Sequence, residues 1–510
     1  MNIFGNICAS VLGSIGSIVV AILILLFMIT IHEAGHYFVG KIFKFKINEF
    51  AIGMGPALYK KTKKNGEIFS VRALPLGGFC AFEGEDEESE GESDPGAFNN
   101  KKPWQRILVL LAGATMNFLA AIIIFMLAFG IYGQTSYQAF ETVPHAESVS
   151  ALESGDVIVK LNGKDIYLST DMIAALKGKK AGDYVEAVVL RGGVQADGTV
   201  SAKKAEKKTI SLQLLCDPDS KNLQDYSKVF KSLGIATIFG ISDSSEYDQT
   251  KLIKGDYVLR ITKEKPEFSD ASLAGTHGYT DCVFYENGVK KQYAIDEKNY
   301  LAEMRVYSLD EMRLALASYN EGDTAYLYVS RSVSDIEAER ILLEYKLDGF
   351  NDEVKSSAEK FNEYFGINAV ATSFRISSLN VRYGFFESMG RGFVNSFKSA
   401  GSTFSALGQL LTGKLGIDAL GGPVTTISIT SQYVSYGFEY LLQIAGFIGV
   451  SLAAFNILPI PALDGARAVF VLIEWIRKKP VNRKVEGTIH AVGLVALLLF
   501  AVLIDLVKCF

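Results

Sequence analysis

The sequence is poor in cysteine, and its cysteines are not spaced as metal or disulfide motifs. The five are Cys8, Cys80, Cys216, Cys282 and Cys509, and they form no CxxC or CxxH pattern. We therefore predict neither a cysteine-based zinc site nor a disulfide framework. A single bridge between Cys216 and Cys282 stays open, because both fall in one predicted soluble region.

An excess of positive charge is also lacking. The chain has 51 Lys and Arg against 56 Asp and Glu, a net charge of −5. Nucleic-acid-binding proteins carry a basic patch or stripe, so we predict no nucleic-acid partner. The N-terminus lacks the basic region that opens a signal peptide, so we expect the first apolar run to be retained.

What the chain does have is apolar sequence in long runs. Hydrophobic residues make up 49% of its 510 residues, and mean hydropathy is +0.21. Residues 11–31 carry no charge, and about 20 apolar residues suffice to span a bilayer as a helix. We predict a multi-pass membrane protein with spans within residues 1–40, 104–133, 437–466 and 489–510.

The first apolar run ends in His32-Glu33-Ala34-Gly35-His36. On a helix this spacing stacks the two imidazoles on one face, with the glutamate beside them. The competing interpretation is a chance match to a short pattern. Three polar groups so close together at membrane depth are hard to satisfy without a metal. We therefore predict that His32 and His36 bind one Zn²⁺ and that Glu33 is the catalytic base.

A catalytic zinc site needs a third protein ligand and one open position. The third predicted span ends in Asn456-Ile457-Leu458-Pro459-Ile460-Pro461-Ala462-Leu463-Asp464-Gly465. Two prolines break the helix here, and irregular backbone at membrane depth persists only inside protein or beside a wet cavity. Asp464 is the predicted third ligand. The competing interpretation is a proline-terminated helix with an Asp-Gly cap. For His145, His277 and His490, ordinary surface or interface roles suffice.

Substrate contacts are predicted from polar and proline residues near these motifs. Asn117 in the second span and Asn456 are expected to donate to a carbonyl or developing oxyanion. Pro459 and Pro461 are expected to line the same site. As a competing interpretation, Asn117 only joins helices. Asn65-Gly66 within residues 41–103 predicts a β-hairpin that holds substrate extended by strand addition, or else an ordinary surface hairpin.

The region between the second and third spans contains an internal duplication. Gly155-Asp156 and Gly255-Asp256 each precede a strand pattern, a helix pattern and a further strand. We place two domains at 144–231 and 232–350, the second enlarged by an insertion at about 265–305. A linker with an amphipathic helix is expected at 351–436. The acidic stretch 83–94 is expected to be a solvated loop.

Charge asymmetry predicts the orientation in the membrane. Short loops rich in Lys and Arg face the cytoplasm. One set follows the first span: Lys41, Lys44, Lys46, Lys60, Lys61, Lys63, Lys64 and Arg72. Another lies between the last two spans: Arg467, Arg477, Lys478, Lys479, Arg483 and Lys484. We therefore expect the metal motifs near the cytoplasmic side and the duplicated region outside the cytoplasm.

Taken with these motifs, the chain resembles the site-2 proteases, in particular their bacterial RseP-like branch. The resemblance rests on His32 to His36, on Asn456 to Gly465, on Leu76-Gly77-Gly78 and on four spans around a duplicated region. It implies a four-helix membrane protein with a cytoplasmic-side β-hairpin and two α+β PDZ-like extracytoplasmic domains. It also implies an intramembrane zinc metalloprotease in the bacterial cytoplasmic membrane.

The resemblance further implies the partners. Its substrates would be single-span membrane proteins, either anti-sigma factors or signal-peptide remnants, which another protease has already trimmed. The PDZ-like pair would act as a size filter for them. Two other protein classes predict different sequences. An inactive membrane-tethered PDZ scaffold would lack a ligand or the base, and none is missing. A metal transporter would carry more carboxylates and histidines along several spans.

Overall fold

We describe the fold from a computed structural model. It describes residues 2–85, 94–139, 152–218, 227–274, 279–286, 288–296, 305–306, 308–332, 338–374, 376–413, 416, 421–479 and 481–509. Most of the acidic stretch 83–94, together with His145 and His277, lies outside these residues.

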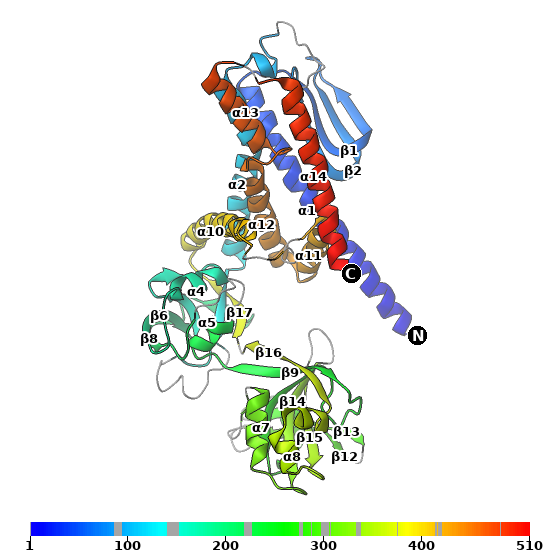
Figure 1. Ribbon diagram of the computed structural model, residues 1–510, viewed down its shortest axis with the longest axis vertical. Coiled ribbons are helices and arrows are strands. Elements are labelled where there is room, and N and C mark those ends of the chain that lie inside the picture. The colour runs from blue at the N-terminus through cyan, green and yellow to red at the C-terminus, as the bar shows by residue number, and fades with distance from the viewer. Residues whose placement is uncertain are drawn as a thin grey trace.

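Four long apolar helices form the membrane part of the molecule. They are α1 (Asn2–Ile42), α2 (Pro103–Ile131), α12 (Phe438–Ile457) and α14 (Arg483–Cys509). The segments long and apolar enough to cross a membrane are Gly16–Ile42, Pro103–Ile131, Phe438–Ile457 and Lys484–Leu506. The prediction of a four-span protein is confirmed. In Figure 1 the two chain ends lie at the end of this bundle nearer the β-rich units.

A β-hairpin lies beside the other end of the bundle, as Figure 1 shows. It consists of β1 (Ile47–Thr62) and β2 (Ile68–Phe82) and is followed by η1 (Phe98–Asn100). Gly66 has φ +85°, which fits the predicted Asn65-Gly66 turn. Residues 49–52 pair on one side with residues 78–81 and on the other with 68–71. Residues 49–52 therefore lie between two segments of β2, and residues 78–82 form an outer edge of the hairpin.

The first β-rich unit is a seven-stranded sheet in the order β7-β17-β3-β4-β6-β8, with β5 beside β4. Its strands are β3 (Gln134–Ala139), β4 (Val157–Leu161), β5 (Lys164–Asp165), β6 (Tyr184–Arg191), β7 (Val200–Ser201), β8 (Glu206–Gln213) and β17 (Ile376–Arg382). The helices α4 (Ser169–Leu176) and α5 (Ser227–Ser232) belong to this unit, and their apolar residues share one buried cluster with the strands.

The second unit is an eight-stranded sheet in the order β11-β13-β12-β15-β14-β10-β9-β16. Its strands are β9 (Thr237–Ser244), β10 (Asp256–Thr262), β11 (Phe268–Ser269), β12 (Tyr279–Glu286), β13 (Val289–Asp296), β14 (Thr324–Ser332), β15 (Ala338–Lys346) and β16 (Ile367–Phe374). Its helices are η2 (Ala271–Leu273), α7 (Leu309–Ala317), α8 (Asp352–Ser356) and α9 (Ala358–Tyr364). Cys216 and Cys282 are both free, so the bridge left open above is absent.

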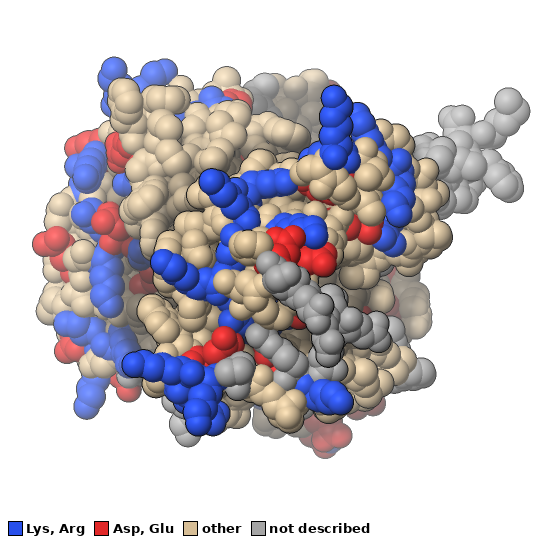
Figure 2. Space-filling view, turned by 90° about the horizontal axis from the view of Figure 1, so that it is seen from above, with Lys and Arg blue, Asp and Glu red and all other residues tan. Residues whose placement is uncertain are grey.

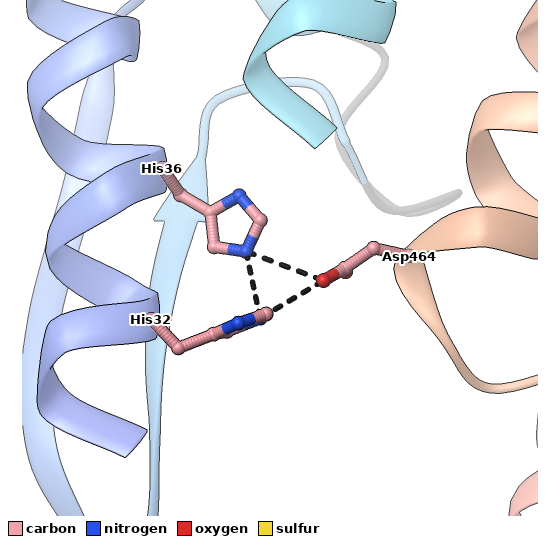
Figure 3. Close-up of side chains that lie close together, drawn as sticks. All are labelled: His32, His36 and Asp464. Atoms are coloured by element: carbon pink, nitrogen blue, oxygen red, sulfur yellow. Dashed lines mark hydrogen bonds and ion pairs between the residues drawn. The ribbon is translucent and has the colours of Figure 1, made fainter. Parts of the chain in front are cut away.

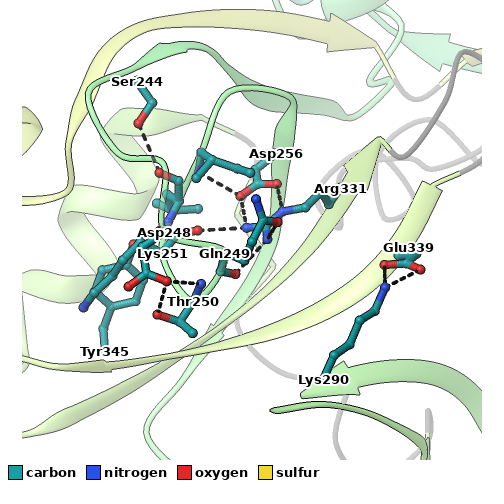
Figure 4. A network of polar contacts seen from close by, with 12 residues as sticks. Ser244, Asp248, Gln249, Thr250, Lys251, Asp256, Lys290, Arg331, Glu339 and Tyr345 are labelled. Atoms are coloured by element: carbon teal, nitrogen blue, oxygen red, sulfur yellow. Dashed lines mark hydrogen bonds and ion pairs between the residues drawn. The ribbon is translucent and has the colours of Figure 1, made fainter. Parts of the chain in front are cut away.

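The two units repeat one buried ion pair at the duplicated Gly-Asp motif. In the first, Arg191 Nε donates to Asp156 Oδ1 at 2.7 Å. In the second, Arg331 Nε donates to Asp256 Oδ1 at 2.7 Å and its Nη2 to Oδ2 at 2.8 Å. Figure 4 shows that Arg331 also donates hydrogen bonds to the backbone carbonyls of Gln249 and Lys251, in the loop that precedes β10. Bidentate pairs of this kind fix geometry as well as charge.

The strand β17 belongs to the first sheet and leads the chain back to the membrane part. It follows the second unit in sequence but pairs with β3 of the first sheet, Ser378 opposite Tyr137. The predicted linker 351–436 thus contains β16 and β17, as well as α10 (Phe385–Leu411) and α11 (Pro423–Ser435). The amphipathic helix predicted in this linker is α10, which lies between the first unit and the bundle (Figure 1). Lys398 on α10 pairs with Asp171 at 2.7 Å.

Candidate metal centre

Three side chains that could hold a metal ion come from distant parts of the chain and meet at one point (Figure 3). His32 and His36 lie one turn apart on α1, and Asp464 is the first residue of α13 (Asp464–Arg477). The Nε2 atoms of His32 and His36 lie 2.9 and 3.4 Å from Oδ2 of Asp464. The two Nε2 atoms are 3.1 Å apart. Both imidazoles are buried, with 8% and 7% exposure.

Close helix packing brings these side chains together. At Gly35, between the two histidines, a Cβ would lie 2.4 Å from the carbonyl oxygen of Ala112, so α1 touches the backbone of α2. At Gly465 a Cβ would lie 2.3 Å from the carbonyl oxygen of Ile457. The start of α13 therefore folds back against the end of α12. Only residues without a side chain permit both approaches.

The imidazole of His36 is oriented by a backbone carbonyl. Its Nδ1 lies 2.8 Å from the carbonyl oxygen of Val109 on α2. A carbonyl can only accept, so Nδ1 carries the proton, and the lone pair of Nε2 points toward His32 and Asp464. Metal-binding histidines are held in this way by a partner on their outer nitrogen.

Asn117 lies behind His32, buried with 0% exposure. Its Nδ2 is 3.5 Å from His32 Nδ1, and its Oδ1 has no hydrogen-bond partner among the residues that the structure describes. The two ends of an amide are interchangeable in a structure without hydrogens. With the amide turned, Oδ1 would accept from Nδ1–H of His32 and leave His32 Nε2 free to bind a metal.

The ligand atoms fit a zinc ion. Bonds of about 2.0–2.1 Å in a tetrahedron place neighbouring ligand atoms about 3.3 Å apart, close to the separations of 2.9, 3.1 and 3.4 Å found here. The space between them is kept open by Gly113 on α2. A Cβ there would lie 2.5 Å from His36 Nε2 and 2.7 Å from His32 Nε2.

Glu33 lies on α1 beside the ligands and faces the hairpin. A Cβ at Gly78 would lie 3.3 Å from Glu33 Cγ, and the backbone of Cys80 lies near the Glu33 carboxylate. The hairpin thus reaches the site through its outer edge, residues 78–82, not through the Asn65-Gly66 turn. No other described strand pairs with this edge.

The remaining predicted residues lie on the segment that leads into Asp464. Asn456 is in the last turn of α12, and Pro459 and Pro461 lie between α12 and α13. Next to Pro461, the Ala462 N–H donates to Nδ1 of His490 at 3.0 Å. From the sequence alone, only a surface or interface role is expected for His490. Sequence motifs do not reveal the roles of Gly113 and Val109 either, because these roles depend on contacts between helices.

Comparisons with known proteins agree with this geometry. A model of peptidase family M50 matches residues 20–500. "Regulator of sigma E protease" of Haemophilus influenzae is 24% identical over 508 residues, which cover 98% of this chain and 100% of the relative. "Protease RseP" of Yersinia pestis is 25% identical, covering 96% and 97%. A Thermotoga maritima relative, provisionally named a zinc metalloprotease, is 26% identical, covering 94% and 96%.

Proposed function

Because the chain is a zinc metalloprotease of peptidase family M50, we propose that it hydrolyses a peptide bond within the transmembrane segment of single-span membrane proteins. The observation that carries this proposal is the position of the metal centre. His32 and His36 lie on α1 within the candidate span Gly16–Ile42. A site at that depth is suited to a bond that is itself within the membrane.

His32, His36 and Asp464 are the residues that would hold the zinc ion, and Asn117 would orient His32. When bound, zinc acts as a Lewis acid and lowers the pKa of water to about 7. Glu33 would take a proton from the attacking water and deliver it to the leaving amine. Asn456 is proposed to stabilise the developing oxyanion, beside Pro459 and Pro461.

The hairpin edge is proposed to present the substrate. A peptide bond within a helix is shielded by the hydrogen bonds of that helix, so the substrate must be extended before cleavage. Residues 78–82 offer an edge that no other described strand occupies, and this edge lies beside Glu33. Pairing of the substrate with the edge would hold it extended by strand addition. The Asn65-Gly66 turn itself would not contact substrate.

The charge pattern supports an orientation with the metal centre near the cytoplasm. Viewed from the end that carries the hairpin and α13, Lys and Arg side chains spread over much of the molecule (Figure 2). Lys60 and Lys61 on the hairpin are exposed, as are Lys478 and Lys479 after α13. Such residues favour the cytoplasmic side of a bacterial inner membrane. The two β-rich units would then lie outside the cytoplasm.

The substrate class and partners follow from this orientation. Two relatives are named regulators of sigma E, so an anti-sigma factor is one proposed substrate, and a signal-peptide remnant is the other. We propose that the β-rich units, with PDZ-like domains at about 144–231 and 232–350, exclude substrates with large extracytoplasmic parts. An upstream protease would therefore trim each substrate first.

The test compares Glu33→Gln with Asp464→Ala in purified protein. We expect Glu33→Gln to keep zinc and thermal stability while cleavage of a single-span substrate falls by at least about 10²-fold, the usual effect of losing a general base. We expect Asp464→Ala to lose zinc in metal analysis. Glu344→Gln, an exposed substitution in the second β-rich unit, is the control.

Two results would contradict the assignment. Cleavage at the wild-type rate by Glu33→Gln would remove Glu33 from catalysis. Full zinc retention by Asp464→Ala would remove Asp464 from the ligand set. Accumulation of trimmed single-span proteins in cells that carry Glu33→Gln would identify the substrates.

A further inference from the structure

The segment that leads into Asp464 has a strained backbone. Ala462 has φ +83° although it is not glycine. An alanine in this left-handed region is strained and persists only where surrounding contacts impose it. Because Asp464 follows two residues later, whatever imposes this conformation also sets the position of the Asp464 carboxylate.

The contacts that impose it come from α14. Nδ1 of His490 accepts the N–H of Ala462 at 3.0 Å. One helical turn further, Gly493 lies against the same segment, where a Cβ would approach Pro461 Cβ to 2.3 Å. The helix backbone at Gly493 thus supports Pro461 by direct contact, and His490 holds the next peptide group by a hydrogen bond.

Packing alone does not explain a histidine at this position. The ring of His490 lies edge-on to Phe470 of α13, with centroids 5.6 Å apart. Its Nε2 is buried and has no hydrogen-bond partner among the described residues, and an unsatisfied buried group is costly. A phenylalanine would fill the same space without that cost. What only the imidazole supplies here is the acceptor at Nδ1.

We propose that His490 is a positioning residue for the zinc centre, which acts by holding Ala462 in its strained conformation so that Asp464 meets His32 and His36. This rests on the proposed function, in which Asp464 is a zinc ligand. Without the His490 bond, Ala462 relaxes to an ordinary backbone conformation and the Asp464 carboxylate moves away from the two imidazoles. Zinc affinity then falls while the helices remain folded.

The experiment measures zinc affinity of the purified full chain in detergent, by competition with a chelator. We expect His490→Phe and His490→Gln to weaken zinc binding by about 10–100-fold, as losses of orienting partners do. We expect His490→Asn to retain affinity near wild type, because Oδ1 of asparagine can occupy the position of Nδ1 whereas the glutamine amide extends past it.

Two further variants sharpen the comparison. Ala462→Gly removes the strain, so adding it to His490→Phe should recover much of the lost affinity. Val492→Phe is the matched control, since it puts an aromatic residue on an exposed face of the same helix (63% exposed) and should leave affinity unchanged. Thermal unfolding of each variant separates loss of zinc from loss of the fold.

Wild-type affinity in His490→Phe and His490→Gln would overturn the proposal, as would equal losses in His490→Asn and His490→Gln. If the Phe variant does not fold, the Asn and Gln pair decides the question. Asp464→Ala in the same assay tests the proposed function separately. If it loses zinc while the His490 variants do not, only the positioning role fails.

Discussion

At position 113 on α2 only glycine leaves room between the two imidazoles. A Cβ there would lie 2.5 Å from His36 Nε2, within the space that a zinc ion needs. The nitrogens of His32 and His36 would have to separate to accommodate a methyl group. This makes Gly113 part of the metal centre although it offers no ligand atom.

We expect Gly113→Ala to bind zinc at least about tenfold more weakly than wild type, with a corresponding loss of proteolysis. Metal analysis and chelator competition on purified protein measure it. Gly130→Ala is the control on the same helix, because nothing lies within 4 Å of its Cβ position. Helix propensity favours alanine over glycine by about 1 kcal/mol, so the control should be as stable as wild type. Unchanged zinc affinity in Gly113→Ala would contradict the geometry.

The candidate ligands themselves could be predicted from residues. The spacing of His32 and His36 places both on one helical face, and the motif around Asp464 breaks a span at matching depth. The orienting groups could not be predicted in this way. Val109 acts only through its backbone carbonyl, and Gly113 matters because it has no side chain. His490 and Asn117 gain their roles from helices that are adjacent only in the folded chain.

The β1–β2 hairpin is fastened to α1 by a buried carboxylate. Glu67 pairs with Lys41 at the end of α1 and with Lys63 at 2.6 Å. Burial opposes its ionisation, but hydrogen bonds from Lys41, Lys63, Tyr37 and Asn65 outweigh this and lower the pKa of Glu67 to about 2. The charged carboxylate therefore holds the hairpin against the helix that carries Glu33.

The pH dependence follows from the lowered pKa. Because the ordinary pKa is 4.5 and that of folded Glu67 about 2, its stabilisation is complete above pH 4.5 and is lost as the pH falls toward 2. We expect amide hydrogen exchange of residues 47–82, corrected for intrinsic rates, to be constant from pH 7 to 5 and to rise below pH 4. A rise already between pH 7 and 5 would contradict this assignment.

At pH 7 we expect Glu67→Gln to destabilise the hairpin by about 1.5–3 kcal/mol, the cost of losing hydrogen bonds to a charged group. Hydrogen exchange and limited proteolysis of residues 47–82 measure it. Lys64→Gln, on the neighbouring exposed lysine, is the control and should behave as wild type. Equal protection in the Glu67 variant and wild type would show that other contacts hold the hairpin.

At the scale of the molecule, the second β-rich unit is inserted into the first. The first sheet is completed by β17, which follows the whole second unit in sequence. The two buried clusters share no residue. Thr237 and Phe374, where the chain enters and leaves the second sheet, are paired strand partners, so they lie only about 5 Å apart.

Because the second unit is inserted into the first, we predict that it can be removed without unfolding the first. We expect a variant with a Gly-Ser-Gly linker in place of residues 238–373 to keep its first sheet and its zinc, with zinc content and thermal unfolding as the measurements. The matched control removes residues 238–382, which deletes β17 and leaves β3 without its partner. That variant should unfold at lower temperature. If both variants unfold alike, the two sheets are not separate folding units.

The four spans, the hairpin turn, the repeated Gly-Asp motif and the candidate ligand types can be predicted from the chain alone, because each depends on local periodicity, turn chemistry or side-chain chemistry. The folded structure is needed to see which groups orient the candidate ligands, which edge of the hairpin faces Glu33, and that β17 returns to the first sheet. Those features depend on backbone approaches between segments far apart in the chain. Gly35 and Gly493 permit such approaches, to the backbones of Ala112 and Pro461, and Gly113 leaves room for the imidazoles of His32 and His36. No local pattern reveals which distant segment each glycine will meet.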